Sequence, residues 1–193
     1  MIRAFFAIDL PLEFREEIAR LQGLLKRSRA EVKWVRPESV HLTLKFLGQV
    51  AEETIDPLAA KAAKKVSRIP AVTLGLSGAG VFPGPKRPRV AWVGLAGDMA
   101  VMGDLQKGIE EAAAEFGFER EKRKFSPHLT LGRIRPSKRI GELMSELDRI
   151  DPKPLEFLAR EVILFKSDLK PTGAVYTPLK TLPLRGVPTE ESS

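Results

Sequence analysis

The sequence predicts an α+β protein made of two similar lobes, each with a small, mainly antiparallel sheet and covering helices, and a cleft between the lobes. Three observations predict this fold. Helix and strand patterns interleave along the 193 residues, two of the strands look like hairpin neighbours, and the tetrapeptide HLTL occurs twice, at 41–44 and 128–131. Interleaved elements with hairpin pairing favour the α+β class, and a repeated segment is typical of internal duplication.

The elements of the first half follow from hydrophobic period and turn residues. Residues 2–9 alternate and are rich in Phe and Ile, which predicts a strand. Pro11 opens a helix that runs to Ser28 with leucines at helical spacing. The remaining elements expected here are strands at 32–35 and 40–47, a helix at 52–67, and strands at 71–82 and 89–95 on either side of the turn PGPKRP.

The second half repeats this rhythm. A helix is expected over 98–116, followed by a charged loop and the strand in FSPHLTLGRI. A helix at 138–150 and strands at 155–166 and 174–181 complete the pattern. We therefore expect residues 1–193 to form a single bilobal domain in which each lobe carries one HLTL copy. The polar tail at 186–193 is expected to fray.

Composition narrows the function classes. The chain has no cysteine, which excludes disulfides, thiolate nucleophiles and Cys-based zinc sites. No apolar run is long enough to span a bilayer, and the N-terminus lacks the pattern of a signal peptide, so we expect a cytoplasmic protein without membrane association. The scarcity of thermolabile residues resembles that of proteins from hot environments.

The net charge of +7 favours a polyanionic partner. Solubility alone would also account for surplus lysines, so the placement of the charge matters. Three basic clusters stand out, and the last two bracket the second HLTL copy: Lys86, Arg87 and Arg89; Arg120, Lys122, Arg123 and Lys124; and Arg133, Arg135, Lys138 and Arg139. This placement predicts a positive surface near His128, suited to RNA or another phosphate ester.

The only two histidines open the two HLTL copies. In a strand, alternate residues share a face. The first copy is therefore expected to turn Val40, Leu42, Leu44 and Phe46 toward the core and His41, Thr43 and Lys45 toward the other face. In the second copy His128 and Thr130 share the non-core face. Each strand would present an imidazole beside a hydroxyl.

Two histidines on non-core faces suit general acid–base chemistry. An unperturbed imidazole pKa near 6.5 lets one ring be neutral while the other is charged. If the strands face each other, one ring can remove a proton and the other can supply one, while the threonine hydroxyls hold phosphate oxygens. A satisfied structural histidine is a weaker alternative, because a core histidine would sit at the other parity of the strand. A metal site is weaker because there is no HExxH pairing and no carboxylate beside either histidine on its exposed face. A Ser126–His128 nucleophile pair is weaker because no GxSxG elbow occurs, and no Gly-rich phosphate loop is present.

The paired motifs also resemble the two-histidine phosphoesterases, and within them the RNA 2′,3′-cyclic phosphodiesterases, also called 2′-5′ RNA ligases. The resemblance extends over nearly the whole chain. It is carried by RAFFAIDLP, VKWVRPESVHLTLKFLG, GAGVFPGPKRPRVAWVGL, FSPHLTLGR and FKSDLKPTGAVYTPL, in that order. It implies a bilobal fold with pseudo-twofold symmetry and a catalytic cleft between the lobes. The two-histidine chemistry itself needs no metal, and we expect no cofactor.

The resemblance implies hydrolysis of an RNA 2′,3′-cyclic phosphate to a 2′-phosphomonoester. His41 would be the proton donor to the leaving 3′ oxygen, and His128 the proton acceptor that activates water. Attack by an RNA 5′-hydroxyl in place of water would give a 2′-5′ linkage. Because the two motifs are identical, the residues alone do not assign the two roles.

The phosphate-binding residues expected beside the histidines are Thr43, Thr130, Arg133 and Lys45. Arg133 matches the family pattern, but simple alternation puts it on the core face, so a bulge at Gly132 is needed to return it. Lys45 follows Thr43 at the matching parity. Phe46 and Trp34 are expected as core or cleft-wall residues that can also stack a base, and Tyr176 as a packing residue.

The expected partner is RNA with a 2′,3′-cyclic phosphate end, such as a tRNA half or a short oligonucleotide, bound by a monomer. The sequence does not rank these substrates. Two further hypotheses remain: RNA ligation as the biological reaction, and an RNA-binding module without turnover. A module that only binds needs Lys and Arg but no matched pair of histidines, which favours the enzyme.

Overall fold

The computed structural model describes residues 1–171 and 173–186. Within these residues nine strands form one sheet, in the order β7-β4-β5-β6-β3-β1-β8-β9 with β2 paired to β6. The strands are β1 (Ile2–Ile8), β2 (Val32–Trp34), β3 (Leu42–Val50), β4 (Val72–Phe82), β5 (Val90–Gly97), β6 (His128–Ile134), β7 (Glu156–Ala159), β8 (Glu161–Lys170) and β9 (Gly173–Pro183). Each pairing between these named strands is antiparallel.

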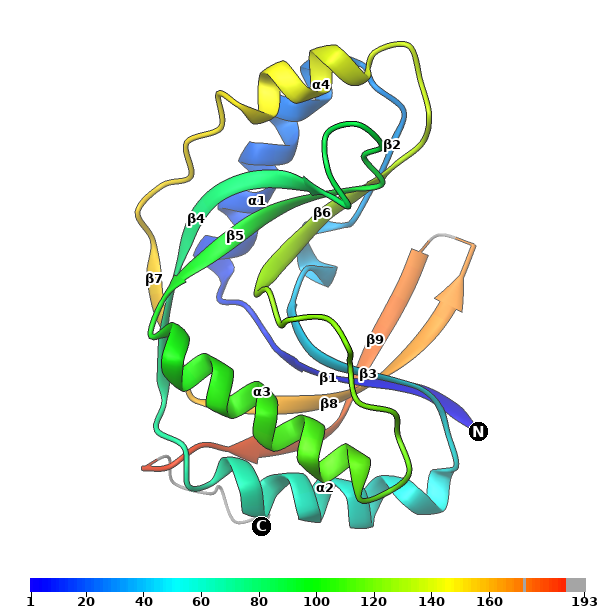
Figure 1. The fold of residues 1–193 in the computed structure, drawn as a ribbon, viewed down its shortest axis with the longest axis vertical. Coiled ribbons are helices and arrows are strands. Elements are labelled where there is room, and N and C mark those ends of the chain that lie inside the picture. Colours follow the sequence, from blue (N-terminus) through cyan, green and yellow to red (C-terminus); the bar gives the residue numbers. More distant parts are fainter. Residues whose placement is uncertain (172, 187–193) are drawn as a thin grey trace.

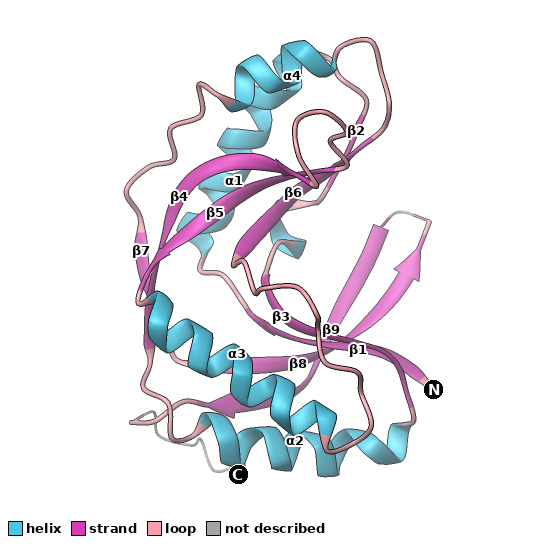
Figure 2. Cartoon of the chain, viewed as in Figure 1, coloured by secondary structure: helices cyan, strands magenta, loops and turns pink. Residues whose placement is uncertain are grey.

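The sheet has two halves that meet between β3 and β6. We call β1, β3, β8 and β9 the His41 half, and β2 and β4–β7 the His128 half. Helices α2 (Glu52–Val66) and α3 (Met99–Ala114) pack together beside the first half, whereas α1 (Leu12–Leu25) and α4 (Ile140–Leu147) cover the second. Figure 1 shows the sheet curling between these two pairs of helices, and Figure 2 shows that the helices share its outer side.

The main core lies between the helices and the sheet. It is filled by side chains such as Phe6, Phe14, Ile18, Leu58 and Leu105, all inaccessible or nearly so. A second, smaller cluster occupies the opposite face of the His41 half and contains Phe5, Ala7, Ile163 and Phe165, with Tyr176 packed against it. We call this side of the sheet, away from the helices, the open face.

The α+β class with mainly antiparallel pairing is confirmed. The two small sheets expected from the sequence are joined into one through the β3–β6 contact. The run expected as one strand at 155–166 is divided at Arg160 into β7 and β8, and the helix expected at 138–150 is shorter, at Ile140–Leu147. Apart from Gly186, the tail expected to fray lies outside the described residues.

The other expected strands and helices are found close to their predicted bounds. Of the helices that the structure describes, none combines the length and the apolar character that crossing a membrane requires.

Candidate active site

The two HLTL copies meet through one residue pair. Leu42 of β3 is the antiparallel partner of Leu129 of β6. Continuing this register by one residue each way sets His41 across from Thr130 and Thr43 across from His128. The two copies thus meet at equivalent leucines, and the extended register sets each imidazole opposite the hydroxyl residue of the other copy.

Each copy contains a β-bulge at its last leucine. In β3 the register with β1 shifts between Thr43 and Lys45, which leaves Leu44 as the extra residue. In β6 the register with β5 shifts between Thr130 and Gly132, which leaves Leu131 as the extra residue. A one-residue bulge reverses the alternation of side chains beyond it. The parity expected from simple alternation therefore holds only up to these leucines.

The bulge corrects two predictions in the first copy. Lys45, expected at the phosphate, is 7% exposed and points into the core, where its Nζ donates to the Glu110 carboxylate at 2.9 Å. Phe46, expected to face the core, is instead 64% exposed and lies 5.9 Å from Phe5 on the open face. An ammonium already paired and enclosed in this way is not available to a ligand, so Lys45 is removed from the phosphate-binding set.

The bulge in the second copy has the opposite consequence. Arg133 is exposed while Gly132 and Ile134 on either side are buried, so its side chain leaves the core face. The guanidinium also lies close enough to Tyr176 to affect it: burial raises the pKa of the Tyr176 phenol, and the charges of Arg3 and Arg133 oppose that rise. A bulge that returns Arg133 is present, at Leu131, one residue before the expected Gly132. Arg133 corresponds in position to Phe46 of the first copy.

Both imidazoles are held in the same way. The Nδ1 of His41 lies 3.0 Å from the Ser39 carbonyl, and the Nδ1 of His128 lies 2.7 Å from the Ser126 carbonyl. A carbonyl oxygen can only accept a hydrogen bond, so Nδ1 must carry the proton in each ring. Each Nε2 is then left for chemistry. The contact of Ser126 with His128 is made by its backbone carbonyl.

The two threonines are half-buried beside these rings. In the described part of the chain, neither the Thr43 nor the Thr130 hydroxyl has a hydrogen-bond partner, whereas the side chains of Arg15, Gln22 and Ser28 each donate to a backbone carbonyl. Two unengaged hydroxyls next to two imidazoles form a donor set suited to the oxygens of a small anion.

His41 lies among aromatic rings. Its ring stacks on Phe5 with centroids 4.7 Å apart, and Tyr176 meets it edge-on at 5.0 Å. This burial lowers the pKa of His41, while the Ser39 carbonyl and the nearby Asp9 oppose the decrease. A pocket of about 200 Å³ opens beside the ring and is lined by residues that include Asp9, Arg15, Phe165 and Tyr176.

His128 has a different neighbour. Phe82, near the end of β4, meets its ring edge-on at 4.9 Å and lies 5.1 Å from Trp92. The two halves of the site are therefore symmetric in backbone but not in side chains, because His41 has an enclosing aromatic cluster and His128 has one edge contact.

The aromatic rings that surround the two histidines were not identified from the sequence. Phe5, Phe82 and Phe165 were not singled out, and Tyr176 was expected only to pack, although it contacts His41. The repeated spacing in SVHLTL and SPHLTL was the available signal for the serine carbonyls. Trp34 packs against the main core, as expected. Among the residues that the structure describes, no three His, Asp or Glu side chains are grouped to hold a metal ion.

This fold and site define a phosphoesterase with two histidines at a strand junction. The chain belongs to the LigT-like phosphoesterase family, whose model matches residues 8–92 and 99–176. It is 34% identical over 186 residues to the RNA 2′,3′-cyclic phosphodiesterase of Methanothermobacter thermautotrophicus, covering 95% of this chain and 99% of that protein.

Solved structures agree. The protein TT0787 of Thermus thermophilus aligns with a TM-score of 0.78 and 30% identity, covering 96% of this chain and 99% of the other. E. coli LigT complexed with 3′-AMP aligns with a TM-score of 0.77 and 31% identity, covering 95% and 98%.

Proposed function

We propose that this protein hydrolyses RNA 2′,3′-cyclic phosphate ends to 2′-phosphomonoesters without a metal ion. His41 is the proton donor and His128 the proton acceptor. The observation that carries the proposal is the pairing of Leu42 with Leu129, which sets each imidazole opposite the threonine of the other copy. Membership in the LigT-like family and the similarity to a named RNA 2′,3′-cyclic phosphodiesterase support the substrate class.

The reaction balances with two proton transfers. The Nε2 of His128 removes a proton from water as the water oxygen bonds to phosphorus. The bond from phosphorus to the 3′ oxygen breaks, and Nε2 of His41 supplies the proton that this oxygen needs. The Nδ1–H contacts to the Ser39 and Ser126 carbonyls keep both rings oriented and stabilise whichever ring is charged.

Charge on the phosphate grows as water attacks. The hydroxyls of Thr43 and Thr130 donate to the non-bridging oxygens, and the Arg133 guanidinium supplies positive charge from the His128 side. The aromatic rings around His41 restrict water near the leaving oxygen. Phe46, exposed on the open face, provides a flat apolar surface at the corresponding position of the first copy.

The test is incubation with a short RNA that ends in a 2′,3′-cyclic phosphate, in the presence of EDTA. We expect a product heavier by one water, whose new phosphate is removed by phosphatase and maps to the 2′ position. His41→Ala and His128→Ala should each reduce the rate on the order of 10²-fold or more. An RNA that binds but is never opened would favour a binding module. A 2′-5′ product on adding a 5′-hydroxyl RNA would show ligation.

A second substrate separates the two histidine roles. If the bridging 3′ oxygen is replaced by sulfur, the leaving thiolate needs little protonation, because thiol pKa values lie near 8.5. We expect His41→Ala to recover most of its lost rate with this substrate and His128→Ala to recover none. If His128→Ala recovered its rate with this substrate and His41→Ala did not, His128 would be the proton donor and His41 the proton acceptor. A cytoplasmic location and a monomeric state are part of the same proposal.

A further inference from the structure

A loop rich in cations precedes His128. This loop, residues 118–127, connects α3 to β6, and we call it the basic loop. It carries four exposed cations against two carboxylates, Glu119 and Glu121; the cations are Arg120, Lys122, Arg123 and Lys124. Among the described residues none of the four forms an ion pair with a carboxylate. Two lysines of α2 differ, since Lys61 and Lys65 are paired with Glu115 and Glu111.

The basic loop is attached to the strand that carries the first motif. The buried carboxylate of Glu110 on α3 accepts from Lys45 Nζ at 2.9 Å and from the Glu121 backbone N–H at 3.3 Å. Lys45 Nζ also donates to the Glu119 carbonyl. A single buried ion pair thus joins α3, β3 and the loop. The loop backbone is therefore held at Glu119 and Glu121, on either side of Arg120 and directly before the other three cations. A backbone held in this way lowers the entropy lost when a ligand orders the loop.

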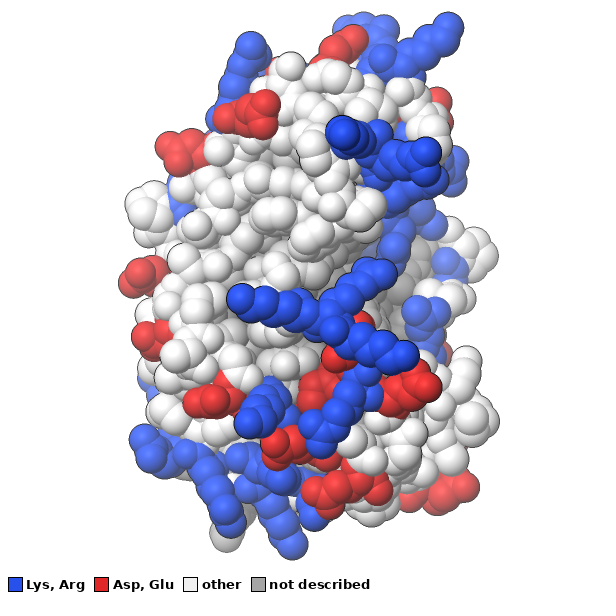
Figure 3. Space-filling model, in the orientation of Figure 1, with Lys and Arg blue, Asp and Glu red and all other residues white. Residues whose placement is uncertain are grey.

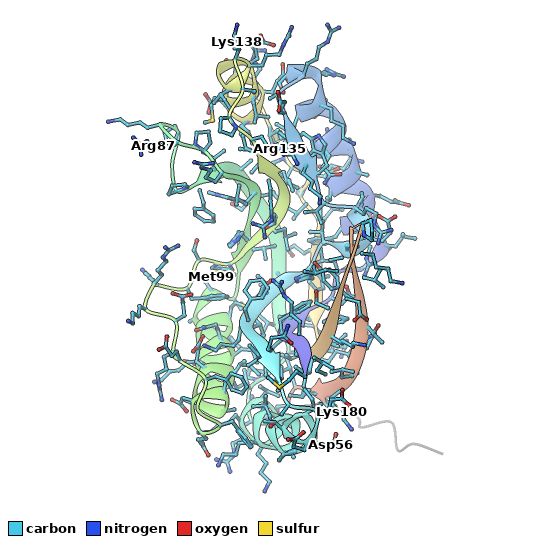
Figure 4. All side chains as sticks on the ribbon, turned by 90° about the vertical axis from the view of Figure 1, so that its right-hand side faces the viewer. Asp56, Arg87, Met99, Arg135, Lys138 and Lys180 are labelled. Carbon is cyan, nitrogen blue, oxygen red and sulfur yellow. The ribbon has the colours of Figure 1, made fainter. Side chains whose placement is uncertain are left out.

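The loop lies at the edge of the candidate active site. Lys124 is four residues before His128, a span of at most roughly 14 Å even when fully extended. In Figure 1 the loop passes in front of the sheet, and in Figure 4 it projects on the same side as the β4–β5 turn, whose Arg87 is labelled. Figure 3 shows Lys and Arg side chains crossing this face, over the loop and over that turn.

We propose that the four cations of the basic loop bind RNA phosphates on the 5′ side of the cyclic end. This inference rests on the proposed function. A cyclic phosphate closes the 3′ end of an RNA, so the rest of the strand can leave the site only in the 5′ direction. The basic loop carries a net positive charge next to His128, with four cations against two carboxylates, within reach of the first few backbone phosphates. Nonspecific strand binding is mainly electrostatic.

The β4–β5 turn is the alternative surface along which the RNA strand would leave the site. Its cations Lys86, Arg87 and Arg89 lie at the far end of β6, because the Ile134 N–H donates to the Arg89 carbonyl at 2.8 Å and Val90 pairs with Arg133. Within the described residues the turn has no attachment to a buried ion pair comparable to Lys45–Glu110. The attachment of the basic loop to this ion pair, together with its position directly before His128, is the reason for choosing it over the turn.

The experiment compares a nucleoside 2′,3′-cyclic phosphate with a ten-nucleotide RNA that has the same end. In the loop variant Arg120, Lys122, Arg123 and Lys124 are all replaced by Gln. We expect kcat/KM for the nucleoside to stay within about twofold and kcat/KM for the RNA to fall at least about tenfold at low salt. The slope of log kcat/KM against log salt should become shallower by up to about 3, at roughly 0.7 for each phosphate of the single strand that is no longer neutralised.

Two variants serve as comparisons, and circular dichroism and thermal unfolding verify the fold of each protein. The control replaces four exposed cations outside the loop and the turn by Gln, namely Arg27, Lys64, Arg68 and Arg160. It has the same net charge as the loop variant, and we expect its ratio of RNA to nucleoside activity to be unchanged. The turn variant replaces Lys86, Arg87 and Arg89 and is expected to reduce RNA hydrolysis less than the loop variant.

Three outcomes would overturn the inference. In the first, the loop variant loses kcat/KM equally for the nucleoside and the RNA. In the second, the loop variant keeps its kcat/KM for the RNA. In the third, the turn variant loses more kcat/KM for the RNA than the loop variant does. Failure of the proposed function looks different, because the unmodified protein would then hydrolyse neither substrate.

Discussion

Leu42 and Leu129 are antiparallel partners, and within the described residues their pairing alone joins β3 to β6. Both leucines are fully or almost fully buried, so the junction is held by core packing while the neighbouring residues face away from it. The histidine before each leucine and the threonine after it are thereby placed on the open face. The site is built at the point where the two halves of the sheet touch.

The pH dependence should show the low pKa of His41. Burial against Phe5 and Tyr176 disfavours the imidazolium, so His41 loses its proton below pH 6.5 in the free protein. We expect kcat/KM to be bell-shaped, because the reaction needs one proton on the pair of imidazoles. The decline of activity on the acidic side should lie below pH 6.5, where His41 takes up its proton. Because the chain has two histidines, proton NMR titration with His128→Ala assigns both signals. A His41 signal that titrates above 6.5 would contradict this account.

Replacing Arg133 should impair the reaction more than replacing a neighbouring arginine. The bulge at Leu131 brings Arg133 to the open face. We expect Arg133→Gln to reduce kcat/KM about 10²-fold, in the range for one transition-state donor, and Arg133→Lys to retain part of it. Arg135→Gln, at the exposed position beyond β6, is the control and should change little. Equal effects of the two glutamine variants would argue for a general charge effect.

Lys45 should matter for stability. Its ion pair with Glu110 is almost completely buried, and removing one partner leaves the other charge unpaired. Lys45→Met should lower the free energy of unfolding by about 3–5 kcal/mol, measured by urea denaturation. Lys61→Met breaks the partly exposed pair with Glu115 and should cost only about 0–1 kcal/mol. Normal stability with weakened binding of inorganic phosphate would return Lys45 to the phosphate-binding set.

Gly132 should not tolerate a side chain. A Cβ there would lie 2.6 Å from Val32 Cγ1 and 3.1 Å from Trp34 Cε3, so β2 would have to move. Gly132→Ala should therefore destabilise the protein by about 1–3 kcal/mol and lower activity through Arg133. Gly103→Ala, in α3 with open space around it, should stabilise by about 0.5–1 kcal/mol. Similar unfolding midpoints for the two variants would contradict the steric argument.

The residue pattern was sufficient for the elements and for the two histidines. Period-2 alternation placed His41, Thr43, His128 and Thr130 on a non-core face, and that assignment needs only a strand of four residues. The same rule was wrong at Lys45 and Phe46 because it assumes an unbroken ladder, and both β3 and β6 contain a bulge. The glycine before Arg133 was a usable signal of the bulge in β6. No residue next to Lys45 gave a comparable signal of the bulge in β3.

The sequence by itself determined the class of fold, the repeated motif and the residue types of the site, because these depend on short-range alternation and on chemistry that each side chain carries alone. Only the tertiary structure decided which residues meet. The pairing of Leu42 with Leu129, the burial of Lys45 by Glu110 and the rings around His41 all join positions distant in the chain. Such contacts are selected by the packing of the whole core, which no local pattern contains.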